Sequence, residues 1–306
     1  MAIPNLFIVG AAKCGTTSLY QYLDQHPEIA MSTWKEPRFF GSDLVIRNDD
    51  RCRDMNQYLA LFQHAPEAKV LGEATVYYMP SEKAAEEIKA FNPEAKIIIM
   101  LRNPVDMMFS WHGQLVWRGA EPLTCFEDAL AAEAKRVQGR DIPRSAPFPA
   151  AVCYRKMATF STQVARYLNT FSKDQVKIII FDDFINQTER IYKEILAFLE
   201  VDLNHQADFQ VVNAAASKKF RNLRVRSLLR TYSMLQKPLG WIPARYRGKA
   251  ADWVASITGS QIQRQKQMDP GLRVQLMETF RPDVEKLGAM IDRDLVSQWY
   301  DEYSSE

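Results

Sequence analysis

Four short apolar runs predict buried β-strands. They cover residues 5–9, 70–73, 96–101 and 176–181. Runs such as IIIML and VKIIIF show no regular alternation of polar and apolar residues, which is typical of strands that are covered on both faces of a sheet.

Between and after these runs, apolar residues recur at the spacing of α-helices. The predicted helices cover residues 16–25, 81–91, 105–117, 154–171, 189–198 and 270–291. Strands that alternate with helices predict an α/β fold with a central parallel sheet and helices on both of its faces. Because the sequence contains no internal repeat and no low-complexity linker, we expect a single domain over residues 1–306.

Composition is that of an ordinary globular protein. The 306 residues are 47% hydrophobic and 25% charged, and the net charge of +2 argues against a nucleic-acid coat protein. No apolar run reaches the roughly 20 residues of a membrane-spanning helix, and the apolar start lacks the basic segment of a signal peptide. The cysteines and histidines show no metal-ligand spacing. We therefore expect a cytoplasmic protein without a metal site.

One stretch stands apart in charge. Residues 209–251 contain ten Lys or Arg residues and no Asp or Glu, with apolar residues between them. We expect a basic flap or subdomain at about 209–265 that guides an anionic or amphipathic acceptor to a site. A structural cover for the sheet and peripheral membrane contact through Trp241, Arg245 and Arg247 are the alternatives. No nucleic-acid partner is expected, because no reader motif accompanies the charge.

A glycine-bearing turn, GAAKCGTTS at residues 10–18, joins the first strand to the first helix. Backbone N–H groups and the helix dipole favour an anion at such a turn. Gly10, Gly15 and Thr17 fit the Walker A pattern, but Thr16 occupies the lysine position and Lys13 lies three residues earlier. The turn predicts an anion site that its lysine approaches from a different side. A tight turn capped by threonine is the structural alternative.

The third predicted strand ends at a second candidate phosphate contact, Arg102. Ligands of an open parallel sheet lie beyond the carboxyl ends of its strands, and a guanidinium binds phosphate through two parallel hydrogen bonds. Ser110, about two turns into the following helix, is placed to contact the same phosphate. A surface ion pair between Arg102 and Asp106 is the alternative.

Together with the sequence WKEPRFF at residues 34–40, these motifs resemble the sulfotransferases that use 3′-phosphoadenosine 5′-phosphosulfate (PAPS), most closely the bacterial and heparan-sulfate-type branch. The spacing fits from about residue 5 to 200, and a closing helix ending at Trp299 fits more loosely. The resemblance implies a P-loop-like three-layer α/β/α fold. It also implies PAPS as donor, adenosine 3′,5′-bisphosphate as product and no metal. A sulfuryl group would be transferred to a hydroxyl or amine of a carbohydrate, lipid or small metabolite.

The resemblance also implies roles for individual residues. Nucleotide contacts would come from Lys13, Cys14, Gly15, Thr16, Thr17, Ser18, Arg102 and Ser110, and from candidates among Lys218, Lys219 and Arg221. Lys13 would also stabilise the charge that builds on the leaving oxygen. Acceptor contacts are expected from Trp34 and Arg38. From its place two residues past Ser110, we expect His112 to contact the acceptor as well and to be the next candidate base, with a surface histidine as the alternative.

Glu36 would be the base that deprotonates the acceptor. We expect burial in its aromatic-rich loop to raise the pKa of Glu36 toward neutrality. A surface carboxylate paired with Lys35 or Arg38 is the alternative.

Two other function classes stay open. Residues 176–181, followed by Asp182 and Asp183, resemble a Walker B strand, which favours a P-loop kinase or nucleotide hydrolase that uses Mg-ATP. The missing Walker lysine at Thr16 argues against that class. A non-enzymatic nucleotide- or polyanion-binding module on the same sheet would have no need of a base at Glu36.

Overall fold

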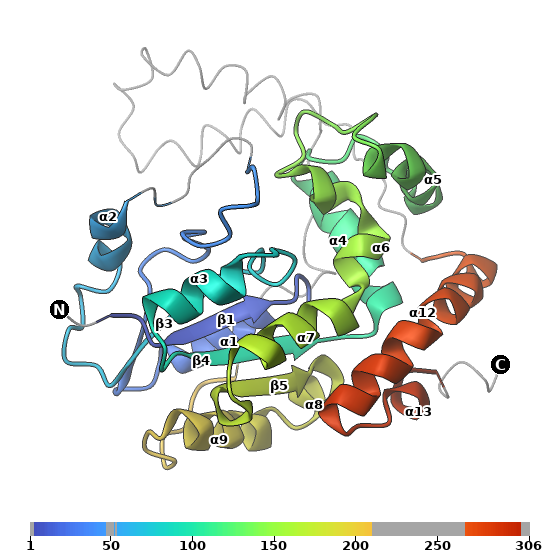
Figure 1. Cartoon of the computed structure of the whole chain (residues 1–306). Helices are drawn as coiled ribbons and strands as arrows, with labels where there is room; N and C mark the ends of the chain where they lie inside the picture. The colour runs from blue at the N-terminus through green and yellow to red at the C-terminus, as the bar shows by residue number, and fades with distance from the viewer. Residues whose placement is uncertain (1–2, 47–51, 53, 210–266, 301–306) are drawn as a thin grey trace, which may run out of the picture.

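The computed structural model describes residues 3–46, 52, 54–209 and 267–300 (Figure 1). Within them, five strands form one parallel sheet in the order β2-β3-β1-β4-β5. The strands are β1 (Leu6–Gly10), β2 (Ile29–Met31), β3 (Val70–Ala74), β4 (Lys96–Leu101) and β5 (Val176–Ile180). Four of them confirm the predicted runs to within one residue at each end. The sequence does not predict β2, because three apolar residues are too few to form a pattern.

Most of the predicted helices are also confirmed. These are α1 (Thr16–Leu23), α3 (Ala84–Phe91), α4 (Pro104–Trp117), α9 (Thr188–Leu199) and α12 (Pro270–Ile291). The closing helix that the resemblance implies near Trp299 is α13 (Leu295–Tyr300). Further elements are not predicted by the sequence pattern, namely α2 (Met55–Ala60), α5 (Phe126–Val137), α8 (Phe181–Asn186) and the 3-10 turns η1 (Pro149–Val152) and η2 (Lys173–Gln175).

The predicted helix over residues 154–171 is wrong in one respect, because it is two helices, α6 (Tyr154–Ala158) and α7 (Phe160–Thr170). The break falls at Thr159, whose φ of −76° and ψ of 85° are not helical. The carboxylate of Asp283 on α12 accepts hydrogen bonds from the N–H groups of Phe160, at 2.9 Å, and Ser161, at 3.3 Å. A side chain more than 120 residues away in sequence thus caps α7, which no local pattern could indicate.

The strand order places a crevice for a ligand beyond the carboxyl ends of β1 and β4. The connection after β1 leads toward the β2 edge, whereas the connections after β3 and β4 lead toward the β5 edge. Because βαβ crossovers are right-handed, these connections lie on opposite faces. α1 contacts β1 and β3, and α3 and α7, which contact each other, lie in front of the sheet in Figure 1. The loops after β1 and β4 therefore diverge beyond the carboxyl ends of their strands.

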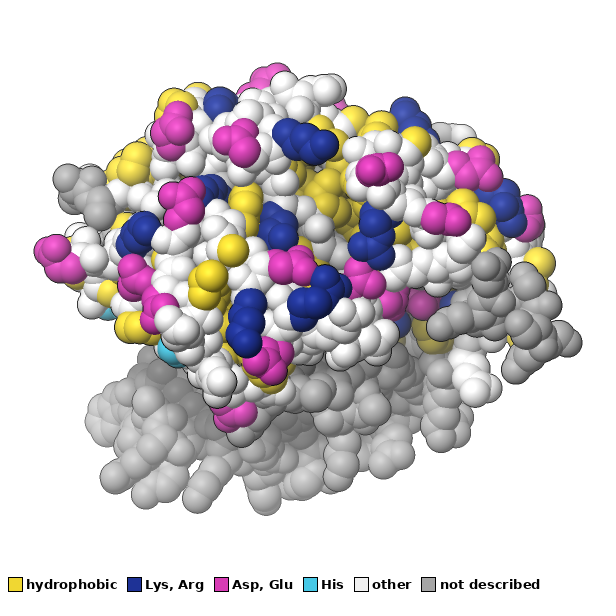
Figure 2. Space-filling model, turned by 90° about the horizontal axis from the view of Figure 1, so that it is seen from below, with side chains coloured by type: hydrophobic (Ala, Val, Ile, Leu, Met, Phe, Trp, Pro, Cys, Tyr) yellow, Lys and Arg dark blue, Asp and Glu magenta, His cyan; other side chains and the backbone are white. Residues whose placement is uncertain are grey.

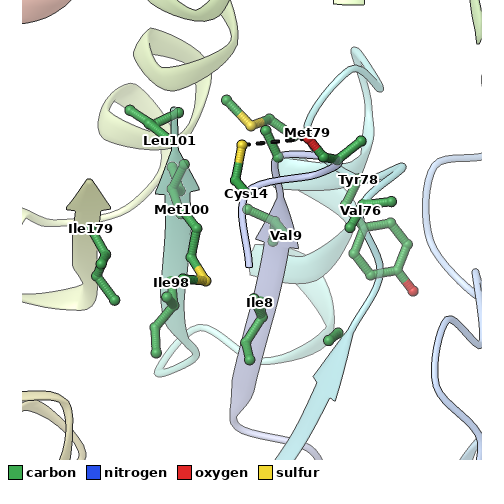
Figure 3. Close-up of a cluster of buried hydrophobic side chains, with 14 of the residues drawn as sticks. Ile8, Val9, Cys14, Val76, Tyr78, Met79, Ile98, Met100, Leu101 and Ile179 are labelled. Atoms are coloured by element: carbon green, nitrogen blue, oxygen red, sulfur yellow. Dashed lines mark hydrogen bonds between the residues drawn. The ribbon is translucent and has the colours of Figure 1, made fainter. Parts of the chain in front are cut away.

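The core lies between the sheet and its helices. Every residue of β1 is buried. Figure 3 shows Ile8 of β1 and Met100 of β4 in one cluster with Ile179 of β5 and Met79, which follows β3. Full burial of one Ile or Met side chain contributes about 1.5–3 kcal/mol to the stability of the folded state. This packing fixes the strand ends from which the loops project.

The outer surface carries mixed charge where it is described. Figure 2 shows basic and acidic side chains interspersed on the face seen from below Figure 1. On α9, Arg190 pairs with Glu194 at 2.6 Å and Lys193 with Glu189 at 2.8 Å. Among the described residues, no helix has the length and apolarity to cross a membrane.

The predicted basic flap, with Lys218, Lys219 and Arg221, lies outside the described residues, apart from Phe209. Its nucleotide contacts, acceptor guidance and membrane contact stay predictions.

Candidate active site

A cavity of about 520 Å³ opens beyond the carboxyl ends of β1, β4 and β5. Its walls come from the turn after β1, the loop around Glu36, one face of α4 and the start of α8. The residues that line it are Ala12, Lys13, Gly15, Thr16, Thr17, Ser18, Tyr22, Lys35, Glu36, Val76, Tyr77, Arg102, Ser110, Trp111, Gln114, Trp117, Arg118, Phe181, Phe184, Ile185, Thr188 and Phe209. The fold thus brings the three predicted motifs to one place.

The turn after β1 has a tight backbone that lines the cavity. Gly15, the N-cap of α1, has a φ of 86°, and a Cβ there would meet the Phe181 ring at 3.0 Å. Glycine is therefore required both for its backbone conformation and for space. Lys13 also has a left-handed backbone, with a φ of 65°, and its Nζ lies 3.5 Å from Oε1 of Gln114. Thr16, Thr17 and Ser18, the first residues of α1, line the same cavity, and N–H groups at this end of a helix have no acceptor within it.

Cys14 contributes no side chain to the cavity, contrary to its predicted place among the nucleotide contacts. Its thiol is fully buried, donates to the carbonyl oxygen of Ala12 at 3.4 Å and lies in the apolar cluster of Figure 3. Burial raises the pKa of the Cys14 thiol to about 12, so the group is protonated and unreactive at neutral pH. Only its backbone belongs to the turn.

Arg102 and Ser110 line the same cavity, as predicted from their positions at the end of β4 and on α4. The guanidinium of Arg102 lies 5.0 Å above the Phe181 ring. Its Nη2 is 3.8 Å from Asp106, but Asp106 also accepts a much closer hydrogen bond, of 2.8 Å, from Arg273. The buried Nε of Arg102 has no acceptor among the described atoms. Because the pair with Asp106 is long and the Arg102 side chain is 28% exposed, the predicted alternative does not prevent this guanidinium from binding a ligand.

The Glu36 loop runs against the end of β3. The N–H of Glu36 donates to the carbonyl oxygen of Ala74 at 3.1 Å. The carboxylate pairs on both sides, with Nη2 of Arg38 at 3.0 Å and Nζ of Lys35 at 3.5 Å. Glu36 therefore makes both ion pairs of the alternative prediction, with Lys35 and with Arg38, and it also lines the cavity.

The expectation for the pKa of Glu36 is wrong. Burial alone would raise this pKa, but the positive charges of Lys35 and Arg38, with the hydrogen bond from Arg38, together lower it below its usual value. The sequence shows both cations but not that they flank the carboxylate. Glu36 is therefore ionised at neutral pH, which is the form in which a carboxylate accepts a proton.

The three predicted acceptor contacts lie outside the cavity that the described residues form. Trp34 is 38% exposed. Arg38 binds Glu36, and its guanidinium lies 4.9 Å above the Tyr77 ring, so it acts on the site through these neighbours. His112 is buried, and its Nε2–H donates to the carbonyl oxygen of Leu123 at 2.8 Å.

The position of His112 corrects its predicted role. Its ring packs beside Phe126 and Tyr154, with centroid distances of 5.3 and 5.7 Å. Burial lowers the pKa of His112, so its ring is neutral at pH 7. The helix register turns this side chain into the core, two residues past Ser110.

Several lining residues were not singled out by the motifs. Ser110 and Gln114 on α4 and Arg118, its C-cap residue, follow one another at intervals of four, so one helix face delivers all three to the cavity. That spacing is the signal by which Gln114 and Arg118 could have been predicted. Burial lowers the pKa of Lys35, which lines the cavity beside Glu36.

The two acids after β5 serve the fold. Asp182 accepts a hydrogen bond of 2.9 Å from Nε1 of Trp299, and Asp183 pairs with Arg293 at 2.9 Å and with Gln298 at 3.2 Å. Both carboxylates thus hold the C-terminal segment around α13, and neither is among the lining residues. The Walker B interpretation, and with it the kinase or hydrolase alternative, loses its main support.

Comparison with known proteins places the chain in a family. The family profile described as the sulfotransferase domain matches residues 4–288. The crystal structure of a sulfotransferase from Alicyclobacillus acidocaldarius is 31% identical and superposes with a TM-score of 0.72, covering 97% of this chain and 99% of that one. The predicted P-loop-like α/β fold is confirmed by this likeness.

Curated relatives match over part of their length. Carbohydrate sulfotransferase 15 of Mus musculus is 24% identical over 294 residues, which cover 78% of this chain and 51% of that protein. Human heparan sulfate glucosamine 3-O-sulfotransferase 6 is 32% identical over 113 residues, which cover 36% of this chain and 30% of that protein. The chain thus spans about half or less of the length of these relatives. The matched profile, the shared fold and the cavity at its sheet edge agree that this chain belongs to the sulfotransferase family.

Proposed function

We propose that the chain transfers a sulfuryl group from PAPS to a hydroxyl or amine of an acceptor. The observation that carries the proposal is that Lys13, the N-terminus of α1 and Arg102 share one cavity with the carboxylate of Glu36. Lys13, the N-terminus of α1 and Arg102 bind anions, and Glu36 accepts a proton. A pure binding module would gain nothing from a buried carboxylate in an anion site.

The residues present fit a nucleotide donor with phosphates at two positions. Lys13 and the first-turn amides of α1 would hold the phosphosulfate. Arg102, with its Nε lacking an acceptor among the described atoms, and Ser110 would hold the 3′-phosphate. The aromatic side chains of Phe181 and Phe184 line the cavity near Arg102 and provide flat apolar surface for a base.

In the proposed reaction, the acceptor oxygen or nitrogen forms a bond to sulfur while the bond from sulfur to the 5′-phosphate oxygen breaks. The acceptor proton passes to Glu36. Negative charge develops on the leaving phosphate oxygen, where the ammonium of Lys13 and the amides of α1 stabilise it. Because the cations beside Glu36 keep it ionised, the base is ready over a wide pH range.

The charges near Glu36 favour an anionic acceptor. Lys35 and Arg118 both line the cavity on this side, and both bear electrostatically on the Glu36 carboxyl. The curated relatives are carbohydrate and heparan sulfate sulfotransferases by name. We infer that the acceptor is a carbohydrate that carries carboxylate or sulfate groups.

The proposal is tested by incubating the protein with PAPS and a panel of neutral and anionic saccharides, and by following products by mass spectrometry. We expect a sulfated product, preferentially from anionic acceptors, together with adenosine 3′,5′-bisphosphate. Phosphate transfer from Mg-ATP, without any transfer from PAPS, would favour the kinase alternative instead.

A further inference from the structure

A fully buried carboxyl group, that of Glu73 on β3, lies behind the Glu36 loop. Three hydroxyl groups donate to it. Oε1 accepts from the hydroxyls of Tyr58, at 2.7 Å, and Tyr78, at 3.0 Å, and Oε2 accepts from that of Thr75 at 2.8 Å. No step of the proposed reaction uses this carboxyl group.

Two of the three hydroxyls also hold the backbone of the Glu36 loop. The oxygen of Thr75 accepts the N–H of Arg38 at 3.4 Å. The oxygen of Tyr78 accepts the N–H groups of Phe39, at 3.0 Å, and Phe40, at 3.4 Å. Consecutive amides just after Glu36 are thus tied to hydroxyls that are themselves tied to Glu73.

The loop needs such support. Glu36 and Arg38 have φ angles of 62° and 55°, in the left-handed region that residues with a side chain seldom adopt. Such conformations persist only where the surrounding structure holds them in place. The hydrogen bonds from Glu36 to Ala74 and from residues 38–40 to Thr75 and Tyr78 are that support.

We propose that Glu73 is a positioning residue for Glu36. A hydroxyl group has one proton, and an ionised carboxylate only accepts hydrogen bonds. Because Glu73 accepts hydrogen bonds from the hydroxyls of Tyr78 and Thr75, their lone pairs are turned toward the loop amides, and each bond of the chain strengthens the next. The loop then places the Glu36 carboxylate in the cavity. This inference rests on the function proposed for Glu36.

This role belongs to the ionised form of Glu73, which predominates above about pH 7 and only accepts hydrogen bonds. Burial raises the pKa of Glu73 to about 7, and the three hydroxyls and the charge of Lys35 act in the opposite direction. Among the described residues, the other titratable groups near it are Tyr58, Tyr78, Tyr167 and Cys52. Burial and the charge of Glu73 raise the pKa of each, so all four are protonated at neutral pH.

The test compares two tyrosines that have the same chemistry and different neighbours. Tyr78→Phe removes the hydroxyl that connects Glu73 to the loop. The matched control is Tyr154→Phe, because the hydroxyl of Tyr154 also donates to a buried carboxylate, that of Glu121, at 2.7 Å. Thr75→Val removes the second connection, and Thr75→Ser keeps its hydroxyl.

We expect Tyr78→Phe and Thr75→Val each to lower kcat about tenfold or more, because loss of a buried hydrogen bond displaces a catalytic group. The Kd for adenosine 3′,5′-bisphosphate should not change. Tyr154→Phe should lose comparable thermal stability and keep its kcat, and Thr75→Ser should restore activity. Equal kcat in Tyr78→Phe and wild type, or equal loss of kcat in both tyrosine variants, would overturn the inference.

Glu36→Gln separates this inference from the function on which it rests. If Glu36→Gln is inactive while Tyr78→Phe keeps full kcat, the positioning role fails and the base stands. If Glu36→Gln is fully active, the base itself is misassigned, and the positioning role fails with it.

Discussion

Nη2 of Arg38 lies 3.0 Å from Oε2 of Glu36, with only Pro37 between the two residues in the chain. Lys35 approaches the other carboxylate oxygen to 3.5 Å. The candidate base is thus held between two cations inside a loop with left-handed backbone at both Glu36 and Arg38. This arrangement keeps the carboxylate ionised and fixes its direction.

Removal of one of these cations should move the pH profile. Arg38→Ala takes away a positive charge and a hydrogen bond that lower the pKa of Glu36, so this pKa should rise. We expect the acidic limb of the kcat/KM profile to shift to higher pH. Arg140→Ala, at an exposed position, is the control. An unshifted acidic limb in Arg38→Ala would mean that Glu36 is not the group that limits activity in acid.

Arg102 should determine recognition of the 3′-phosphate. We expect Arg102→Ala to weaken binding of adenosine 3′,5′-bisphosphate about tenfold to a hundredfold, because charge-assisted hydrogen bonds are lost. Binding of AMP, which lacks the 3′-phosphate, should change little. Titration calorimetry with both nucleotides measures the difference, and equal losses for the two would place Arg102 elsewhere on the nucleotide.

Lys13 should act on the leaving group. Lys13→Ala removes an ammonium from the cavity that the first residues of α1 also line, and we expect turnover to fall about a hundredfold or more. Lys193→Ala, on the outer surface of α9, should be fully active. Steady-state rates with saturating PAPS make the comparison, and a Lys13→Ala enzyme that differs only in its KM for PAPS would show that the lysine binds the donor without assisting the reaction.

Glu73 should make the free energy of unfolding depend on pH. Its pKa is raised from 4.5 to about 7, so the native state binds this proton more tightly than the unfolded state does. The stability that this proton contributes is complete below about pH 4.5 and is lost as the pH rises through about 7. Relative to Glu73→Gln, the wild-type free energy of unfolding should fall by on the order of a few kcal/mol across this interval. Urea titrations at several pH values test this, and a constant difference would contradict the buried, proton-binding carboxyl.

The sequence predicts the sheet well because its strands are buried on both faces. The run of β4 and the glycine turn before α1 are local patterns, and the structure confirms both. The break at Thr159 coincides with a contact that is not local, since Asp283 on another helix caps the start of α7. Because a local pattern does not show this contact, the sequence predicts one continuous helix over residues 154–171.

In the site, too, local motifs predict individual residues, whereas contacts between distant residues do not follow from the sequence. Lys13, Arg102 and Glu36 follow from motifs, whereas the lowered pKa of Glu36 depends on where two flexible side chains come to lie. His112 and Ser110 are close in sequence, but helix register sends one into the core and the other into the cavity. The role of Glu73 needs the hydroxyls of Thr75 and Tyr78 in place, which no spacing indicates.

The most direct test of the account is sulfuryl transfer from PAPS by wild type and Glu36→Gln, with an anionic saccharide as acceptor and mass spectrometry of the product. Glu200→Gln, at an exposed position after α9, is the control. We predict that wild type and Glu200→Gln form the sulfated product at equal rates. Glu36→Gln should bind adenosine 3′,5′-bisphosphate as wild type does while forming product about a hundredfold more slowly. Product formation by Glu36→Gln at the wild-type rate, or none by wild type with any acceptor, would contradict the account.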